Sequence, residues 1–469
     1  MQAVVNPTDV LGEVSPIFKK QQAFYNSGKT LDYKFRVKQI KKLKKAIKDN
    51  EEAAIKALNY DLGKAQMEAY TTEVGFMYPE IEHVLANLKE WMRPEHVATP
   101  LALAPSSSKI MKRPLGQVLI IGPWNYPFQL MLAVLLPAIA AGNTAILKPS
   151  EFTPATNEVI KKIISDTFDE EYIAIVEGEG HVVLPPMIDN LKFNHIFFTG
   201  SVPVGAIIAE QAARHLIPCT LELGGKSPAI VDETANINIA AKRIVWGKFT
   251  NAGQTCVAPD YVLVHNSKKQ QLVDGLKKHI VAAFGENPHQ SADYGRIINE
   301  RRFDALTEFL AEGNILYGGE NDKTDKFIAP TLLDNVHMED KVMKEEIFGP
   351  ILPILTYENL DEVIDIIRQN SHPLALYLFT NKSSVEEKVM SQVAFGGGCV
   401  NDCLMHLGNP DLPFGGVGTS GQGSYHGKYG FDTFSHNQSI IKTPTLIDVP
   451  VRYAPFTNLK EKMVRMFLG

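Results

Sequence analysis

The sequence predicts an α/β protein with a Rossmann-type, doubly wound parallel sheet and a second α/β unit beside it. From residue 116 onward, short apolar segments alternate with helical stretches. The apolar segments are continuous rather than alternating, which is typical of strands buried on both faces. The chain has 469 residues, which exceeds the roughly 250–300 residues that a single hydrophobic core supports. We therefore expect at least two domains.

The composition is that of a globular protein with a large core. Hydrophobic residues make up 45%, charged residues 21%, and the net charge is −6. This acidic balance argues against nucleic acid as a partner. The four cysteines lack the spacing of a disulfide framework, so we expect a reducing compartment, the cytoplasm. No basic segment followed by an apolar one begins the sequence, so we expect no signal peptide.

Residues 15–92 are expected to be helical, because Ile40, Leu43 and Ile47 recur on one helical face. The lysines from Lys38 to Lys48 could form a phosphate-binding patch. We favour a solvated helix face, since acidic residues follow directly. The apolar run from 130 to 141 contains a proline and is too short to cross a bilayer, which predicts a buried helix.

The first sheet is expected to contain five strands, each ending near a helix or a polar turn. They are predicted at 116–123, 144–150, 172–178, 195–201 and 219–225, with helices near 128–142, 154–166 and 203–216. Parallel sheets of this kind bind ligands at the carboxyl ends of their strands.

A second α/β series follows the first. Its strands are predicted at 228–233, 261–266, 351–357, 375–381 and 397–402, with helices near 236–250, 268–284, 300–312 and 360–370. After residue 405 the sequence becomes rich in glycine and then strand-like. We expect this last strand to pair with residues 107–116 as a small outlying sheet.

Two motifs do not support a site. Gly416, Gly418 and Gly421 fit the dinucleotide fingerprint G-x-G-x-x-G, but no strand precedes them and no helix is expected after them. Residues 399, 403 and 406 are Cys, Cys and His, and no fourth ligand lies near them in the sequence. We expect no metal site.

Cys256 is the candidate nucleophile. It follows the polar segment Asn-Ala-Gly-Gln-Thr in a loop between a helix and a strand. Such a loop is where an accessible thiol can be activated, whereas a buried inert cysteine is the alternative interpretation.

Glu222 and Asn125 are candidates for the two other chemical roles. Glu222 lies in an apolar strand that ends at a glycine pair, where burial raises a carboxyl pKa towards that of a general base. A structural ion pair with a nearby lysine is the alternative. Asn125 follows the first strand, so its side-chain amide could donate to an oxyanion together with a backbone amide near Cys256.

Two further segments predict contacts with a dinucleotide. Lys148 and Glu151 end the second strand, where an acid can bind the adenosine ribose hydroxyls and a lysine can tolerate a 2′-phosphate. Gly200, Ser201 and Gly205 form a strand-to-helix turn that can face a pyrophosphate, although Pro203 lies inside it. The choice between NAD and NADP stays open.

Taken together, these segments resemble the aldehyde dehydrogenase superfamily. PWNYP, KPSE, FTGS, ELGGKSP, GQTC and EEIFGP occur in that family's order over nearly the whole chain. GQTCVAPDYVLV and LPFGGVGTSGQGSYHGKYGFDTFSH are similar to the class 3 branch, which includes enzymes for fatty and aromatic aldehydes.

The resemblance implies a role for each matching residue. Cys256 matches the nucleophile, Glu222 the general base and Asn125 the oxyanion donor. Glu346 and Phe348 match the pair that holds the nicotinamide ribose and packs against the ring. The residues that match the other cofactor contacts are Lys148, Glu151, Gly200 and Ser201.

The resemblance also implies an activity and an organisation. We expect oxidation of medium- or long-chain aliphatic or aromatic aldehydes to acids with NAD or NADP. The alternatives are a catalytically silent protein on the same fold and a CoA-acylating enzyme, which generally lacks the Glu222 match. We expect a homodimer without a stable membrane anchor. The implied domains are 1–93 with 117–221 for the dinucleotide, 222–405 for catalysis, 94–116 with 406–446 as an oligomerisation arm, and 447–469 as a tail.

Overall fold

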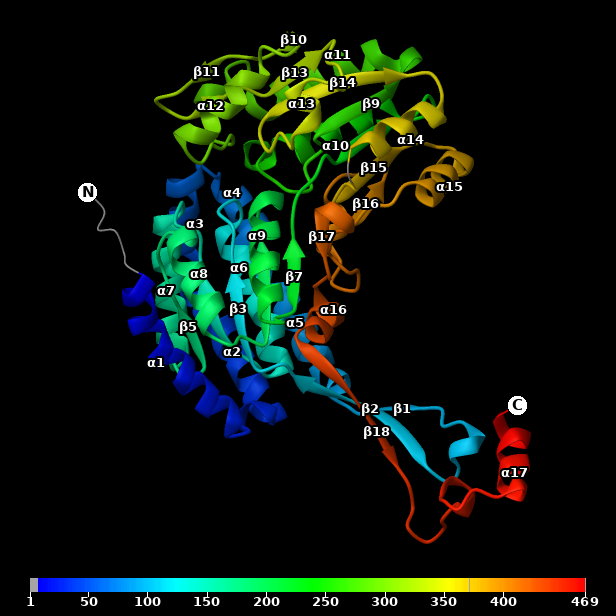
Figure 1. Cartoon of the computed structure of the whole chain (residues 1–469). Helices are drawn as coiled ribbons and strands as arrows, with labels where there is room; N and C mark the ends of the chain where they lie inside the picture. Colours follow the sequence, from blue (N-terminus) through cyan, green and yellow to red (C-terminus); the bar gives the residue numbers. More distant parts are fainter. Residues whose placement is uncertain (1–6, 371, 469) are drawn as a thin grey trace.

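The structure is a computed structural model that describes residues 7–370 and 372–468 (Figure 1). The chain begins with helices, as predicted. These are α1 (Pro7–Asn26), α2 (Tyr33–Asp49), α3 (Glu51–Leu62), α4 (Gln66–Ala69), the π-helical turn η2 (Tyr70–Val74) and α5 (Met77–Trp91). Ile40, Leu43 and Ile47 are fully buried, whereas most lysines between them are exposed. The lysine-rich stretch is therefore a solvated helix face.

The first sheet contains the five predicted strands. They are β3 (Gln117–Ile121), β4 (Thr144–Lys148), β5 (Ile173–Ile175), β6 (His195–Thr199) and β7 (Cys219–Glu222). The order is β17-β7-β6-β3-β4-β5, and only the short β17 (Gly421–Gln422) runs antiparallel to its neighbour. The central strand β3 has later strands on both sides, which confirms the doubly wound arrangement.

Both faces of this sheet are covered by helices, and the continuous apolar strands follow from that. Val118 and Ile120 of β3 join the core beneath α6 (Pro127–Ala141), with α2 and α7 (Pro154–Thr167) on the same side. Leu119 and Ile121 join a separate core beneath α1, α8 (Gly180–Asn190) and α9 (Val202–Arg214). Successive strand residues point to opposite faces, so burial on both faces favours apolar residues at consecutive positions inside the strands, whereas buried polar residues such as Lys148 and Glu222 end theirs.

The longest apolar run lies inside α6, as predicted. Every residue of α6 is buried. Across the described parts of the chain, no helix has both the length and the apolar character needed to span a membrane.

Helix α8 is not predicted by the sequence analysis. Pro185 and Pro186 lie in its middle, and proline within a helix removes a backbone donor and normally breaks the helix. Its first turn begins at Gly180, immediately beside the end of β4, as described below. Helix α15 (Ser383–Gln392) is also missed.

The second sheet has seven strands in the order β10-β13-β14-β9-β8-β15-β16. The predicted strands are β8 (Pro228–Val231), β9 (Tyr261–His265), β14 (Ile351–Tyr357), β15 (Ala375–Phe379) and β16 (Gly397–Val400). The sequence analysis misses β10 (Asn314–Tyr317) and β13 (Thr331–Asp334), and the small hairpin of β11 (Asn321–Asp322) and β12 (Phe327–Ile328). The helices are α10 (Ile237–Phe249), α11 (Lys269–Phe284), α12 (Glu300–Phe309), α13 (Lys341–Lys344) and α14 (Leu360–Gln369).

The predicted outlying sheet is present and projects away from both larger sheets (Figure 1). Its strands are β1 (Glu95–Val97), β2 (Ser107–Pro114) and β18 (Ser435–Lys442), in the order β1-β2-β18 with antiparallel pairing. Helix α16 (Gly427–Thr433) leads into β18, and α17 (Asn458–Leu468) lies at the far end of the arm.

Candidate active site

The carboxyl ends of four neighbouring strands place the predicted polar residues in one row. Glu222, the last residue of β7, pairs with Thr199 of β6. Phe198 of β6 pairs with Ile121 of β3, and Ile121 pairs with Lys148 of β4. The ends of β7, β6, β3 and β4 therefore lie side by side, which is where a doubly wound sheet binds its ligand.

Asn125 lies in the loop that follows β3 and is held from both ends. It is only 4% exposed. Its side-chain Nδ2 donates to the carbonyl of Gln254 over 3.0 Å, which leaves its second N–H for a further acceptor. Its own carbonyl accepts hydrogen bonds from Lys64 Nζ at 2.9 Å and from Asn251 Nδ2 at 2.8 Å. The amide of Asn125 is therefore rigidly oriented beside the loop that carries Cys256.

The Cys256 loop is itself tightly shaped. Asn251 and Ala252 adopt left-handed backbone angles, with φ of 53° and 51°, which non-glycine residues rarely adopt and which the surrounding structure must stabilise. The Tyr126 and Thr255 hydroxyls form a 2.6 Å hydrogen bond between the loop after β3 and the residue before Cys256. The two loops are thus joined on either side of the thiol.

Cys256 is a partly buried residue whose thiol is held in its protonated form. Burial in the site, followed by the charges of Glu346 and Glu222, raises its pKa to about 12, and hydrogen bonding by the amides of Cys256 and Val257 opposes this rise. Because the charges of Glu222 and Glu346 act on the pKa of Cys256, the three side chains lie in one site. Cys256 shares its partly buried state with Cys219 and Cys399, so what sets it apart is the nearby carboxyls of Glu222 and Glu346.

The Glu222 carboxyl is buried and has no hydrogen-bond donor or cation beside it among the described residues. It is 2% exposed, and neither Oε1 nor Oε2 has a hydrogen-bond partner among the described residues. Burial raises its pKa well above the ordinary range. The alternative of an ion pair with the nearby Lys226 is wrong, because Lys226 pairs with Asp260. An unpartnered buried carboxyl is costly, and such groups are found at sites where a proton is moved.

A buried ion pair beneath the site was not predicted. Lys64 and Glu73 form a salt bridge in which both side chains are fully buried. Glu73 Oε2 accepts from the amides of Phe128 and Gln129, at 2.9 and 3.1 Å, in the first turn of α6. Lys64 donates to the Asn125 carbonyl, so the pair fixes the loop between β3 and α6 from below.

Glu346 reaches the site from the second sheet. Its carboxylate lies against the backbone of Gly224, where a Cβ would come within 2.1 Å of Oε2. Burial and the charge of Asp260 raise its pKa to about 8. The segment around Glu346 is fixed because Lys226 Nζ donates to the Glu345 carbonyl at 2.9 Å and Asp260 Oδ1 accepts from the Ile347 amide at 3.1 Å.

Phe348 joins the same group through an aromatic contact. Its ring packs edge-on against Trp124, with 5.3 Å between centroids, and Trp124 immediately precedes Asn125. Its φ of 46° is left-handed, and this strained conformation directs the chain between the two sheets. The structure thus brings Glu346 and Phe348 next to the three predicted chemical groups.

Lys148 and Glu151 form a separate group at the end of β4. Lys148 Nζ donates to Glu151 Oε2 at 2.8 Å, and the Gly180 amide at the start of α8 donates to Oε1 at 3.2 Å. Burial would raise the Glu151 pKa, but the hydrogen bond and charge of Lys148 lower it overall. A Cβ on Gly180 would lie 3.8 Å from Lys148 Nζ. The absent side chain leaves space over the pair.

The turn after β6 has one exposed and two structural residues. Ser201 is the exposed N-cap of α9, and Pro203 occupies its first turn, where proline is tolerated. The Gly200 amide donates to the Glu222 carbonyl at 3.0 Å. A Cβ on Gly205 would lie 2.5 Å from Leu223, so this glycine allows α9 to pack against the residue that follows Glu222.

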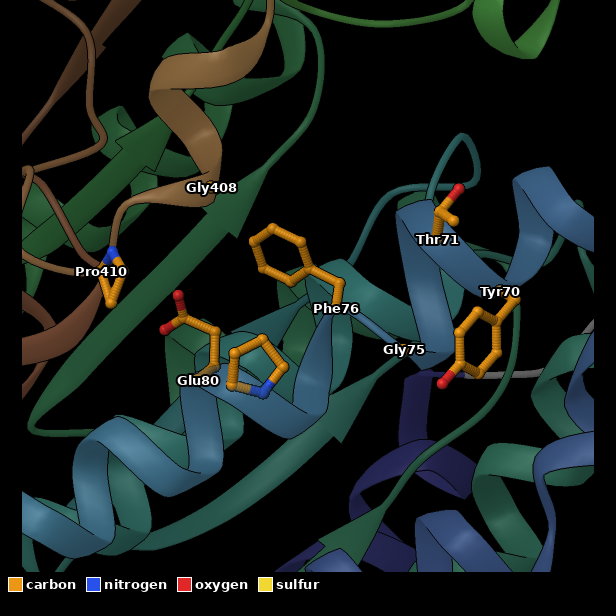
Figure 2. A pocket seen from close by; sticks show the side chains of 8 residues that line it. Tyr70, Thr71, Gly75, Phe76, Glu80, Gly408 and Pro410 are labelled. Carbon is orange, nitrogen blue, oxygen red and sulfur yellow. The ribbon is translucent and has the colours of Figure 1, made fainter.

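A row of aromatic rings connects the site with a surface pocket of about 300 Å³. Burial and the charges of Glu222 and Cys256 raise the pKa of Tyr425 well above its usual range, which places its hydroxyl at the site. The Tyr425 ring lies 4.5 Å from His426, and His426 lies 6.1 Å from Phe76. Phe76 lines the pocket together with Tyr70, Thr71, Gly75, Pro79, Glu80, Gly408 and Pro410 (Figure 2).

The glycine fingerprint and the Cys-Cys-His spacing have structural surroundings. Gly421 pairs with Glu222 in the sheet. The expectation of no helix after these glycines is wrong, because α16 begins at Gly427, but the fingerprint needs an α-helix that starts within the glycine motif itself. Cys399 Sγ lies 3.5 Å from His406 Nδ1, while Cys403 is buried beneath Gly247.

Comparison with known proteins shows which family the chain matches. The model of the aldehyde dehydrogenase family matches residues 13–440. A Staphylococcus aureus protein, 4,4′-diaponeurosporen-aldehyde dehydrogenase, is 51% identical over 96% of this chain and 98% of its own length. The dog protein "aldehyde dehydrogenase, dimeric NADP-preferring" is 41% identical over 95% of this chain and 98% of its own. The solved structure "Substrate bound state of Staphylococcus Aureus AldH" has a TM-score of 0.94 at 50% identity and covers 97% of this chain and 99% of that one.

These matches extend over nearly the full length of the chain and of its relatives, and the fold agrees with the solved structure. The chain is therefore a member of the aldehyde dehydrogenase family, in its class 3 branch.

Proposed function

We propose that Cys256, Glu222 and Asn125 carry out the oxidation of aldehydes to carboxylic acids with NAD or NADP. The main observation behind this assignment is the Glu222 carboxyl, which is buried without a partner and close enough to Cys256 to influence its pKa. A buried base next to a thiol suits the hydrolysis of a thioester.

In the proposed reaction, Cys256, Asn125 and Glu222 act in turn. The Cys256 thiol loses its proton to solvent, Sγ bonds to the aldehyde carbon, and the π electrons of the C=O bond move to oxygen, which gives a thiohemiacetal oxyanion. The free N–H of Asn125 Nδ2 and a backbone amide beside Cys256 stabilise this oxyanion. Loss of a hydride from that carbon leaves a thioester. Glu222 then takes a proton from water, which attacks the thioester, releases the acid and regenerates the thiol.

The residues present fit a nicotinamide dinucleotide. Lys148 and Glu151 offer a donor and an acceptor to a ribose, beneath the space left by Gly180. Glu346 and Phe348 lie at the Cys256 end of the site, and Ser201 begins α9 between the two groups. When bound, NAD or NADP would supply the hydride acceptor. Lys148 makes both cofactors acceptable, and the name of the dog relative favours NADP.

The substrate is proposed to be a medium- or long-chain aliphatic or an aromatic aldehyde. The pocket beside Phe76 is lined mainly by apolar side chains, and aromatic rings connect it with the site. The S. aureus relative is named for 4,4′-diaponeurosporen-aldehyde. Phe128 and Tyr126 are buried in the core, whereas Trp246 is 47% exposed.

The predicted domain ranges and the homodimer are part of the same proposal. We assign 1–93 and 117–221 to the dinucleotide, 222–405 to catalysis, and the arm (94–116 and 406–446) to association. The arm and the tail expose apolar side chains, including Leu101 at 80% and Leu446 at 95%, which a second copy would cover. The proposed compartment is the cytoplasm, consistent with four free cysteines.

Absorbance at 340 nm tests the reaction. The protein is mixed with NAD or NADP and with hexanal, decanal or benzaldehyde, beside Cys256→Ala. Cys219→Ala is the matched control, since Cys219 is a half-buried thiol in β7 outside the site. We expect reduction of the cofactor to disappear only with Cys256→Ala. Added CoA should not change the product, and a CoA requirement would favour the acylating alternative.

A further inference from the structure

The wall of the apolar pocket contains one buried acid. Glu80 lies on α5 and is 6% exposed. Figure 2 shows its carboxylate and the ring of Phe76 pointing towards the side of the pocket formed by Gly408 and Pro410. Apart from Glu80 and Thr71, the residues that line the pocket are glycine, proline or aromatic.

No cation compensates this carboxyl among the described residues. Its hydrogen-bond partner is the backbone amide of Gly427, at the start of α16. His83, one turn along α5, lies 3.7 Å from Asp411, and burial lowers the pKa of His426 to about 4, so His426 is neutral. Tyr425, whose charge couples to Glu80, is neutral as well, because its pKa is raised. Tyr70 is the other titratable side chain among the residues that line the pocket.

Other charges near the pocket have their own partners. Lys428 of α16 pairs with Asp432 at 2.5 Å. On α5, Glu82 faces away and pairs with Lys44 of α2. The pocket wall therefore has an acid with only a neutral donor.

We propose that Glu80 determines substrate specificity: its carboxyl selects aldehydes with an uncharged chain and rejects those that carry an anionic group along the chain. The inference rests on the proposed function, in which the aldehyde reaches Cys256 through this pocket. A like charge placed beside a buried carboxylate is repelled strongly, because the low local dielectric screens it poorly. An uncharged aldehyde chain experiences no such repulsion and can pack against the glycine, proline and aromatic residues of the pocket.

The rejection should depend on pH. Burial raises the Glu80 pKa to about 7, so the carboxyl is largely neutral at pH 6 and ionised at pH 9. An ω-carboxylate on the substrate is ionised throughout this range. The measured quantity is a selectivity ratio: kcat/KM for an alkanal divided by kcat/KM for the ω-oxo acid of the same length. Both substrates react through Cys256 and Glu222, so the pH dependence of those two residues cancels in the ratio.

The experiment compares Glu80→Gln with the wild-type protein and the cofactor that it uses. Unbranched alkanals and ω-oxo acids of six to ten carbons are assayed between pH 6 and 9. For the wild type we expect the ratio to rise about 10- to 100-fold across this range, most strongly at the chain length that places the carboxylate beside Glu80. In Glu80→Gln, which keeps an acceptor for Gly427, the ratio should be low and independent of pH.

Glu82→Gln is the matched control, since it removes one negative charge from the exposed face of the same helix. It should keep the wild-type ratio and pH dependence. A Glu80→Gln protein that oxidises decanal but retains the wild-type ratio would overturn the inference. Failure of the wild type to oxidise decanal would instead count against the proposed function. If Glu80→Gln does not fold, Glu80→Asp is used instead, because the shorter side chain moves the charge back from the pocket. At the chain length for which the wild-type ratio is largest, Glu80→Asp must give a lower ratio.

Discussion

Replacing Lys64 by methionine tests whether the buried ion pair positions the candidate oxyanion donor. Lys64 and Glu73 are fully buried, and Lys64 Nζ also lies 3.8 Å from the centre of the Tyr126 ring. Methionine fills a similar volume but cannot donate to the Asn125 carbonyl. The variant leaves the Glu73 carboxylate with two amide donors and no cation.

The expected loss of folding stability follows from the uncompensated charge of Glu73. Removing one partner of a buried ion pair costs about 3–5 kcal/mol, because the remaining charge is left uncompensated. Glu73, whose pKa is already raised by burial, should take up a proton at higher pH and recover part of that loss. The double variant Lys64→Met, Glu73→Gln should therefore be more stable than Lys64→Met alone, as expected for coupled sites.

The assay combines urea unfolding with steady-state kinetics. We expect a lower urea midpoint and a decrease in kcat of about tenfold or more, because the Asn125 carbonyl loses one of its two donors. Lys44→Met is the control, since Lys44 pairs with Glu82 at the surface and exposed pairs contribute about 0–1 kcal/mol. A Lys64→Met protein as stable and as active as Lys44→Met would refute the positioning role.

Four further outcomes are expected. Glu222→Gln should release one equivalent of reduced cofactor per site in a burst and then turn over about 10²–10⁴-fold more slowly; a full steady-state rate would rule out the base. Alkylation of Cys256 should rise with pH beyond 9, because its pKa is about 12, and should accelerate when NAD or NADP is added; a plateau near pH 8 would contradict this. Gly205→Val should lower the melting temperature, since crowding Leu223 costs about 1–3 kcal/mol, and an unchanged value would argue against tight packing. The Glu80 pKa rises from 4.5 to about 7 on folding, so wild-type stability should fall by about 3 kcal/mol between those pH values relative to Glu80→Gln; parallel stability curves would contradict it.

Much of the fold was predictable because a strand that is buried on both faces can be recognised from its own residues, which are mostly apolar at consecutive positions. Strands β3, β4, β6 and β7 are continuous apolar runs, and each was predicted within a few residues. Helix α8 was missed because Pro185 and Pro186 have poor helix propensity, yet the packing of α8 against α1 and α9 stabilises it. Propensity is local, whereas this stabilisation comes from residues far away in the sequence.

Within the candidate site, sequence and structure contributed different information. Cys256, Glu222 and Asn125 could be selected from their local surroundings, since each follows or ends a predicted element. Glu346 and Phe348 were expected only by resemblance, because nothing in their own segment indicates that it crosses to the other sheet. Their contacts with Gly224 and Trp124 exist only after the two sheets come together.

By itself, the sequence determined the fold class, the positions of the buried strands in the first sheet and the chemical groups available for catalysis. The tertiary structure decided which charges are compensated. Lys64 and Glu73 are one lysine and one glutamate among many in the sequence, and so is Glu80. Folding places the first two together without solvent and leaves Glu80 with a single amide donor. The physical reason is that the free energy of a charge depends on its desolvation and on its nearest partners, and both are set by residues distant in the chain.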